Sequence, residues 1–394
     1  MSIELTEEQK NVVHICVERY KKGERYTVFS GPAGSGKSEC VKFIVAALGV
    51  DPDRDVVYTS FTGRATKILA EKGNKNTSTL HKLLYQHRPT PDGGYIRTKK
   101  SFIEYPIVIV DEVGMVSKEL IEDLFSHKEC HVICCGDEHQ LPPVEKNQDN
   151  HLLDSPHARL TEIHRQAAQS EIIQLATKIR LGEEVPYMRG QEVQVIHKSE
   201  LNTGMLLWAD QVLCSTNNIR IALNKQIREL LGFKGGPQEG EKVICIRNYD
   251  EIYNDNMNGL VNGSIGYLNN CFQTYLNLPY WLGGDVVKIL STDVNCEDGE
   301  FHNLRLDNSL LETGEKSLSS KVEFKMKKNS RFKYQVPLEF LFGYAITAHK
   351  SQGGEWDNVL VIEENFPFNK EEHRRWLYTA VTRAKKKLVL VRND

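Results

Sequence analysis

Short apolar runs recur along the chain, and most are followed by a polar or glycine-rich turn and then by a helical pattern. Apolar runs of this length, ending in Gly, Ser, Thr or Asp, predict buried strands. The runs are Tyr26–Ser30, Val56–Ser60, Ile107–Val110, Val132–Cys135, Val212–Ser215, Tyr344–Thr347 and Val359–Glu363. Alternation of strands and helices favours parallel sheets. We therefore predict an α/β protein with two such clusters, near residues 26–140 and 212–391, bridged by a helix near Ile172–Leu181.

Two segments interrupt this alternation. Residues 85–105 carry a hairpin signal, because Asp92-Gly93-Gly94 lies between short flanks of β-prone residues. Residues 258–333 contain short strand patterns and turns but no long amphipathic helix. We interpret the second segment as a small β-barrel or sheet inserted into the second α/β cluster.

Composition adds few restrictions. The 394 residues carry a formal net charge of -3, so any nucleic-acid binding depends on local basic patches. The N-terminus has no apolar signal run, and no apolar stretch approaches the roughly 20 residues of a membrane span. Nine scattered cysteines include no Cys-x-x-Cys pair. A group around Cys130, His131, Cys134, Cys135 and His139 could ligate a metal, but its strand-like setting favours buried thiols of a reduced cytoplasmic protein that does not enter a membrane.

The first candidate site is a phosphate-binding loop. Residues 30–38 read SGPAGSGKS, which is the pattern G-x-x-x-x-G-K-S between a predicted strand and a predicted helix. The glycines let backbone N–H groups point at phosphate oxygens, and the helix N-terminus adds its dipole. Lys37 would place its charge on the outer phosphates and Ser38 would ligate Mg²⁺. The candidate nucleotide-binding residues of this loop are Gly31, Gly34, Ser35, Gly36, Lys37 and Ser38.

Two further strand ends supply candidate catalytic groups. Asp111 and Glu112 follow Ile107–Val110, so Asp111 would hold Mg²⁺ and Glu112 would orient and deprotonate the attacking water. Gln140 follows the next strand and could reach the γ-phosphate, which would let it report ATP or ADP. The alternative for Gln140 is a polar turn stiffened by Pro142 and Pro143. These residues predict hydrolysis of a nucleoside triphosphate, which alone does not define a function.

The order of the motifs is more specific than any single one. GPAGSGKS, VDEVGMVS, GDEHQLPPV, LTEIHRQ, AITAHKSQGGEWD and YTAVTRAKKKL follow one another along the chain. With them the chain resembles superfamily-one DNA helicases, in particular the RecD-like and phage Dda-like branch, which moves 5′→3′. The resemblance covers nearly all of the chain apart from the two interrupting segments.

The resemblance implies a fold of two tandem RecA-like P-loop NTPase domains, with ATP between them and single-stranded DNA across both. The first domain would contain a hairpin insertion, the pin that meets the duplex fork, and the second an SH3-like insertion. The implied ranges are 1–84 with 106–183 for the first domain, 85–105 for the pin, 184–257 with 334–394 for the second domain, and 258–333 for the SH3-like insertion.

The resemblance also assigns roles to further residues. Gln9 would read the adenine edge, although Thr-x-x-Gln is also an ordinary helix cap. Arg165 and Arg383 would neutralise charge on the γ-phosphate, where the alternative is two surface arginines. Glu355 would face the nucleotide ribose. The residues implied to contact DNA are Phe61, Thr62, Thr79, His81, Ser215, Asn217, Thr347, His349 and Lys350.

Those DNA contacts have an ordinary alternative, because Ser and Thr after a strand often cap helices. An aromatic ring such as Phe61 can stack on any base, which suits binding without sequence preference. Residues 85–105 could also be a solvated hairpin, and residues 258–333 could clamp DNA or bind a partner protein. Preference for DNA over RNA depends on the resemblance alone, since no residue is seen to read a 2′-hydroxyl.

We therefore expect an ATP- and Mg²⁺-dependent 5′→3′ single-stranded DNA translocase and helicase that works as a monomer at DNA forks. Single-strand-binding proteins, or proteins of DNA replication, repair and recombination, are candidate partners. One alternative is a DNA-stimulated ATPase that remodels protein–DNA complexes with little unwinding. Another is a nuclease-helicase, which would need a carboxylate cluster that we do not find outside the motor motifs.

Overall fold

The computed structural model divides the chain into two compact units. It describes residues 5–89, 95–143, 148–164, 167–256, 259–296, 299–364 and 369–393. Unit 1 consists of Met1–Gln86, Lys99–Asn202 and Ala348–Asp394, and unit 2 consists of His87–Thr98 and Thr203–Thr347. The motif AITAHKSQGGEWD therefore begins in unit 2 and continues in unit 1.

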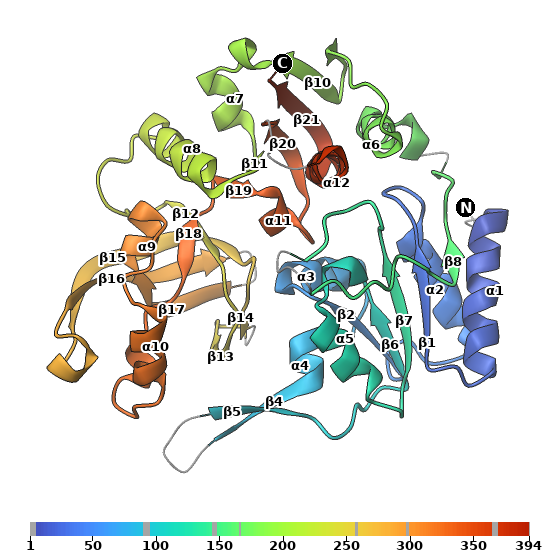
Figure 1. Cartoon of the computed structure of the whole chain (residues 1–394), viewed down its shortest axis with the longest axis horizontal. Helices are drawn as coiled ribbons and strands as arrows, with labels where there is room; N and C mark the ends of the chain where they lie inside the picture. The colour runs from blue at the N-terminus through green and yellow to red at the C-terminus, as the bar shows by residue number, and fades with distance from the viewer. Residues whose placement is uncertain are drawn as a thin grey trace. The chain divides into compact units, whose positions relative to one another are not determined.

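Unit 1 is built on a parallel six-stranded sheet (Figure 1). Its strands in spatial order are β3 (Thr77–Thr79), β2 (Val56–Ser60), β6 (Ile107–Val110), β7 (His131–Gly136), β1 (Tyr26–Ser30) and β8 (Ala158–Arg159). Successive residues of β7 enter different hydrophobic cores: Cys134 packs with Val108, and Cys135 packs with Ile109. Because side chains alternate across a strand, these cores cover opposite faces of the sheet. The described cysteines are free and nearly all buried, as the strand pattern predicted.

A second group of strands in unit 1 comes from the C-terminal third of the chain and the segment after residue 187. Strands β20 (Trp356–Ile362), β21 (Ala384–Arg392) and β10 (Val193–His197) are parallel neighbours, and β9 (Met188–Arg189) runs antiparallel to β10. Val359, Leu360, Leu388 and Leu390 of these strands are fully or almost fully buried.

The helices of unit 1 begin at side-chain caps where their sequences offer one. Thr6 and Gln9 form a capping box at α1, while Ser117 and Asn369 cap α5 and α12. The helices are α1 (Glu7–Lys21), α2 (Lys37–Leu48), α3 (Gly63–Glu71), α4 (Leu80–Leu84), α5 (Lys118–Phe125), α6 (Glu171–Leu181), α11 (Ala348–Ser351) and α12 (Lys370–Val381), with 3₁₀ turns at Val113–Met115, Ala167–Gln169 and Lys198–Glu200. Within the described ranges, no helix is both long and apolar enough for a membrane crossing.

Unit 2 contains a small parallel element. Strand β11 (Gln211–Cys214) pairs with β19 (Ala345–Thr347). Helix α7 (Thr203–Trp208) precedes β11 along the chain, and helix α8 (Asn217–Leu230) follows it. The Asn224 side chain ties α8 to β19: its Nδ2 donates to the Ala345 oxygen at 2.8 Å, and its Oδ1 accepts from the Ala345 nitrogen at 3.0 Å.

The larger part of unit 2 is antiparallel. Its five-stranded sheet has the order β17 (Gly299–Asp307), β16 (Val286–Cys296), β15 (Ile265–Asn277), β12 (Lys242–Cys245) and β18 (Phe340–Phe342). The remaining elements are β13 (Tyr249–Tyr253), β14 (Gly259–Leu260), α9 (Asn308–Thr313), α10 (Ser320–Lys327), 3₁₀ turns at Tyr280–Leu282 and Lys333–Gln335, and the two-stranded sheet of β4 (Tyr85–Pro89) and β5 (Tyr95–Lys99).

The α/β class and the seven predicted strands are confirmed, with ends that differ by a few residues at most. Two strands occur where a hairpin was predicted, whereas its turn at residues 92–94 lies outside the described residues. The antiparallel sheet near 258–333 takes strands β12 and β18 from beyond that range. Residues 320–327 form a helix that the sequence pattern did not reveal, because four of its eight residues are charged.

Candidate nucleotide and nucleic-acid sites

The phosphate-binding loop follows β1 and requires its glycines. Gly34 and Gly36 have φ of 79° and 83°, in the left-handed region that favours glycine, and Gly36 caps α2. A Cβ atom on Gly31 would lie 2.5 Å from Ser35 Oγ, and one on Gly36 would overlap the Gln9 amide. The loop thus exposes backbone rather than side chains at the start of α2, the arrangement that binds phosphate.

Carbonyl groups of the loop hold Lys37 in place. Its Nζ donates to the Gly31 oxygen at 2.6 Å and to the Pro32 oxygen at 3.2 Å. Ser35 Oγ also donates to the Pro32 oxygen, at 2.8 Å. The Lys37 ammonium group is thus held against the loop at the start of α2.

Two oxygen donors suited to Mg²⁺ face one small cavity. A cavity of about 30 Å³ is lined by Ser38 of α2, Asp111 after β6 and Cys135 of β7, among others. A hydroxyl and a carboxylate are ligands that Mg²⁺ accepts, and this metal usually keeps several waters as well. The residues present therefore fit the metal that the loop motif implies.

Glu112 combines a strained backbone with a perturbed carboxyl. Its φ of 53° is uncommon for a residue with a side chain, and such strain often occurs at functional sites. Burial and the charge of Asp111 raise the pKa of the Glu112 carboxyl, while Arg383 and Lys37 oppose that rise. The four charged groups are therefore neighbours, and a carboxyl with a raised pKa is a better proton acceptor than an ordinary glutamate.

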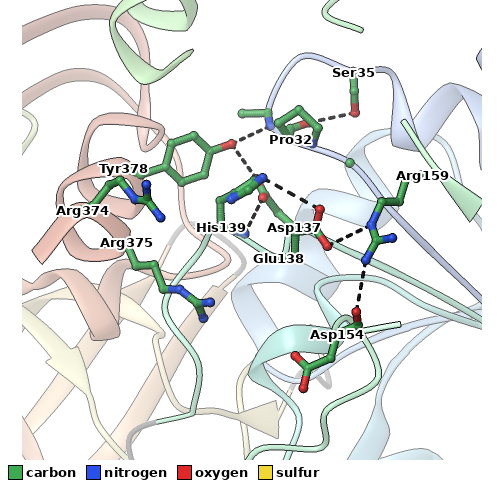
Figure 2. Close-up of polar contacts among 12 residues, drawn as sticks. Pro32, Ser35, Asp137, Glu138, His139, Asp154, Arg159, Arg374, Arg375 and Tyr378 are labelled. Carbon is green, nitrogen blue, oxygen red and sulfur yellow. Dashed lines mark hydrogen bonds and ion pairs between the residues drawn. The ribbon is translucent and has the colours of Figure 1, made fainter. Parts of the chain in front are cut away.

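A tyrosine of α12 connects the loop after β7 to the phosphate-binding loop. The Tyr378 hydroxyl donates to Asp137 Oδ2 at 2.6 Å and accepts from the Ala33 nitrogen at 2.8 Å, so it lies between the two segments (Figure 2). Asp137 Oδ1 accepts from the His139 nitrogen at 3.0 Å. Burial and the Asp137 charge raise the pKa of Tyr378, which keeps the hydroxyl protonated and able to donate. Tyr378 belongs to YTAVTRAKKKL, and no feature of that motif predicts this bridging role.

Further bonds hold α12 and its flanks against the same loop. Thr379 Oγ1 accepts from the Leu141 nitrogen at 2.9 Å, and Gln352 Nε2 donates to the Leu141 oxygen at 2.7 Å. Arg383 is 4% exposed and donates through Nε to the Thr379 oxygen at 3.0 Å. Arg383 is thus a buried residue beside Glu112 and not the surface arginine of the alternative interpretation.

Gln140 lies in the loop after β7, between Asp137 and Leu141, whose bonds to α12 and its flanks are described above. Its backbone nitrogen donates to the Asp137 oxygen at 3.2 Å, and its side-chain Oε1 is buried without a hydrogen-bond partner in the described part of the chain. A buried amide oxygen without a partner is unusual, and it leaves this side chain able to bond a ligand.

A second cavity, of about 350 Å³, is lined by that loop. Asp137, His139 and Gln140 line it together with Arg374 and Arg375 of α12. Burial lowers the pKa of His139, with the charge of Arg374 adding to the effect. Figure 2 shows Arg374 near the Tyr378 ring and Arg375 farther from it. The cavity joins the Gln140 loop to α12, so a change in the loop has a direct route to this helix.

The structure places the remaining nucleotide candidates differently. Gln9 completes the α1 cap and donates through Nε2 to the Ser35 oxygen of the loop at 3.2 Å, so the capping role is present and contact with adenine stays a prediction. The Glu355 side chain is exposed. Arg165 lies outside the described residues. The chain just before it contacts the loop, because the His164 nitrogen donates to the Gly34 oxygen at 3.0 Å.

Four of the DNA candidates lie at one edge of the unit 1 sheet. Strands β2 and β3 pair with Ser60 opposite Thr79, which brings their carboxyl ends together. The Phe61 and His81 rings are 5.7 Å apart between centroids. Thr62 and Thr79 cap α3 and α4 with their hydroxyls, so the ordinary capping role is present and DNA contact stays a prediction.

The other DNA candidates belong to two units. In unit 2, Thr347 pairs with Cys214 at the end of β11, directly before Ser215, whose Oγ is buried without a described partner. Asn217 accepts from Arg220 Nε at 3.2 Å. In unit 1, His349 and Lys350 belong to α11, and burial lowers the pKa of His349. These candidates thus form one set in each unit.

Comparison with known proteins agrees with this geometry. A family model described as an AAA domain matches residues 4–199, and a UvrD-like helicase C-terminal domain matches residues 342–391. The ATP-dependent DNA helicase dda of Enterobacteria phage T4 is 31% identical over 191 residues, covering 45% of this chain and 43% of the relative. The ATP-dependent RecD2 DNA helicase of Deinococcus radiodurans is 26% identical over 411 residues, covering 97% of this chain and 48% of the relative.

The chain therefore spans less than half the length of these two curated relatives. Among solved structures, the Pif1 helicase from Candida albicans superimposes with a TM-score of 0.53 at 18% identity, covering 100% of this chain and 95% of that one. A likeness at this identity shows a shared fold.

Proposed function

Because the chain belongs to the superfamily-one helicases and resembles their RecD-like and Dda-like branch, we propose that it is an ATP-dependent motor that moves 5′→3′ on single-stranded DNA and unwinds duplex DNA. One observation carries the proposal. The charges of Lys37, Asp111 and Arg383, which come from three separate motifs, act on the Glu112 carboxyl within unit 1. Such a constellation suits phosphoryl transfer, which needs a held metal, an oriented water and positive charge on the transferred group.

In the proposed reaction, Ser38 and Asp111 would hold Mg²⁺, which would neutralise part of the phosphate charge. Glu112 accepts a proton from the water that attacks the γ-phosphorus, and the bond to the β-phosphate oxygen breaks to give ADP and phosphate. Lys37 and Arg383 stabilise the negative charge on the transferred group. Gln9 and Glu355 are proposed to contact the adenine and the ribose, and Arg165 to assist Arg383.

Coupling to DNA is proposed to run through α12 and the loop after β7. Tyr378 and Thr379 bond the phosphate-binding loop and the loop that carries Gln140, so ATP at this edge would alter both contacts. The proposed DNA contacts are Phe61, Thr62, Thr79, His81, Ser215, Asn217, Thr347, His349 and Lys350. In support, a Bacteroides Pif1 with a TM-score of 0.52 to this chain was solved bound to single-stranded DNA.

The proposal keeps the domain ranges implied by the family. The first RecA-like domain would comprise 1–84 and 106–183, and the second 184–257 and 334–394. Residues 85–105 would be the pin and residues 258–333 an SH3-like insertion. A Pif1 structure describes two coordinating helicases on forked duplex DNA, whereas we propose that this chain works as a monomer.

Strand displacement tests the proposed polarity. Duplexes with either a 5′ or a 3′ single-stranded tail are incubated with the protein and MgATP, with Lys37→Ala as the inactive control. We expect displacement from the 5′-tailed substrate. Displacement from the 3′-tailed substrate alone would overturn the subfamily assignment.

A deletion separates unwinding from remodelling. Shortening residues 90–100 to a tight turn should abolish fork unwinding while DNA-stimulated ATP hydrolysis continues. If the wild-type protein hydrolyses ATP with DNA but unwinds no fork, the chain is better described as a DNA-stimulated remodelling ATPase.

A further inference from the structure

One short helix of unit 2 concentrates positive charge in an otherwise slightly acidic chain. Residues 321–333 contain six basic side chains and one acidic side chain, a net charge of +5 in a protein of net charge -3. The single carboxylate, Glu323, is occupied by ion pairs with Arg247 at 2.9 Å and with Lys327. The remaining cations of this stretch are therefore not neutralised by it.

Helix α10 sorts these residues onto two faces. Lys321, Phe324, Lys325 and Lys328 recur at i, i+3, i+4 and i+7, which places them on one side of a helix. All four are exposed. We call these four residues the basic–aromatic face. The three lysines form no ion pair with any described carboxylate, so no carboxylate neutralises their charge.

The opposite side of α10 anchors the helix. Met326 is fully buried in a core with Leu282 and Leu276, and Val322 packs against the same core. The face is thus held on a folded support, which Figure 1 shows as the helix beside the long strands β15 and β16. A support of this kind fixes the spacing of the lysines, unlike a disordered basic tail.

Exposed rings accompany the charge. Phe324 is 59% exposed, and Lys328 Nζ lies 4.3 Å from its ring centroid. Beyond the helix, Trp281 is 48% exposed and meets Phe332 edge-on at 5.8 Å, and Tyr334 is 64% exposed. Soluble proteins seldom leave several large rings uncovered in one region without a binding role.

Lysines with interspersed rings match the chemistry of an unpaired nucleic-acid strand. The ammonium groups bind phosphates without reading sequence, and a ring offers a surface on which any base can stack. A duplex would keep its bases stacked on each other and leave Phe324 without a partner. A second copy of this chain would bring like charges together.

We propose that the basic–aromatic face is a binding surface for single-stranded nucleic acid, separate from the predicted contacts at Phe61, Thr79 and Thr347. The proposal depends on the proposed function for the identity of the polymer. Residues 258–333 would then have a defined role, which the sequence left undecided between a DNA clamp and a partner site.

Fluorescence anisotropy with labelled oligothymidylate, repeated over a series of salt concentrations, tests the proposal. The test variant is Lys321→Ala/Lys325→Ala/Lys328→Ala. The matched control is Lys128→Ala/Lys178→Ala/Lys198→Ala, which removes three exposed lysines elsewhere. We expect the test variant to bind about tenfold or more weakly at low salt and to lose about 2 from the slope of log affinity against log salt, because each phosphate contact contributes about 0.7. Equal affinity and slope in the two triple variants would overturn the proposal.

Phe324 tests the ring separately from the charge. Phe324→Ala should weaken binding about fivefold or more without changing the salt slope, since stacking on an aromatic ring releases no counterions. Phe324→Tyr should bind like the wild type. Unlabelled oligothymidylate, polyglutamate of equal charge and a duplex of equal length are compared as competitors. If polyglutamate or the duplex displaces the labelled oligonucleotide as effectively as oligothymidylate does, the assignment to a single strand is overturned.

Two parallel measurements keep the two proposals distinguishable. Thermal denaturation checks that each variant is folded. ATP hydrolysis by the wild type with and without oligothymidylate tests the proposed function. If hydrolysis shows no stimulation but the triple variant still loses affinity, the face stands and the motor proposal fails. If hydrolysis is stimulated but the triple variant binds like its control, the motor proposal stands and the face fails.

Discussion

The phosphate-binding edge of unit 1 and the basic–aromatic face of unit 2 carry similar charged groups in opposite settings. At the edge, Lys37 and Arg383 are bonded to backbone carbonyls and lie beside Glu112. On the face, Lys321 and Lys325 are exposed and unpaired within the described residues. If both proposals hold, the difference follows from the two tasks: preorganised charge suits chemistry, where reorganisation would cost rate, while exposed charge suits binding to a polymer.

The largest effect should come from removing charge at the preorganised edge. Arg383→Ala should lower the ATP hydrolysis rate by about 10³-fold or more, the usual loss for an arginine that stabilises a phosphoryl transition state. Steady-state hydrolysis with saturating single-stranded DNA measures it. Arg375→Ala is the matched control, since Arg375 lies on α12, which ends just before Arg383, and among the described residues it forms an ion pair only with Glu371, at 3.4 Å.

Arg383 is also buried, so its loss could unfold the protein. Thermal denaturation of both variants, and recovery of part of the rate in Arg383→Lys, distinguish the two causes. A rate within tenfold of wild type in folded Arg383→Ala would contradict the proposed role.

The affinity for single-stranded DNA tests whether Phe61 of unit 1 also contributes to binding. Phe61→Ala should weaken oligothymidylate binding by about fivefold to a hundredfold, because stacking of one base on a ring contributes about 1–3 kcal/mol. The salt slope should stay unchanged, in contrast to the lysine variant of α10. Unchanged affinity would place Phe61 in the hydrophobic core alone, where it packs against residues such as Leu80.

Tyr378→Phe should reduce stability by about 1–3 kcal/mol, since it leaves the buried Asp137 carboxylate and the Ala33 N–H without their shared hydroxyl. Denaturant unfolding measures the change. Tyr26→Phe is the control, because no bond of the Tyr26 hydroxyl is found in the described structure. Equal stability of the two variants would show that the Tyr378 bonds do not hold the loop after β7.

The smallest effect concerns pH. Burial lowers the pKa of His131, whose Nδ1 donates to the Glu24 oxygen at 2.7 Å. The unfolded chain therefore binds a proton more readily than the folded one, and stability should fall as the pH drops below about 6.5, the ordinary histidine value. Unfolding of His131→Gln should depend less on pH across that range. A pH profile identical to that of the wild type would exclude His131 as a contributor.

The sequence predicted those parts of the molecule in which a short pattern determines a backbone. The loop at residues 30–38 needs left-handed glycines, and Asp111 with Glu112 must follow a buried strand, so motif and geometry coincide. Strands such as Val56–Ser60 were readable for the same reason, since burial on both sides gives a continuous apolar run.

Other features depend on contacts between distant segments. Tyr378 reaches Ala33 across 345 positions, and no local pattern marks the residue that will bridge two loops. Helix α10 was missed because its charged residues hide the period of its two core-facing positions, the partly buried Val322 and the buried Met326. Strands β12 and β18 belong to the antiparallel sheet although they lie outside the β-rich segment 258–333. The sequence alone does not show which strands pair with one another.

Hydrolysis of MgATP by the purified protein, measured with and without single-stranded DNA, tests the central claim most directly. We expect the DNA to raise the rate by about tenfold or more, because the nucleotide edge and the DNA candidates would share the segment around α11 and α12, and Lys37→Ala should abolish hydrolysis in both conditions. A wild-type rate that is the same with and without DNA would contradict the account.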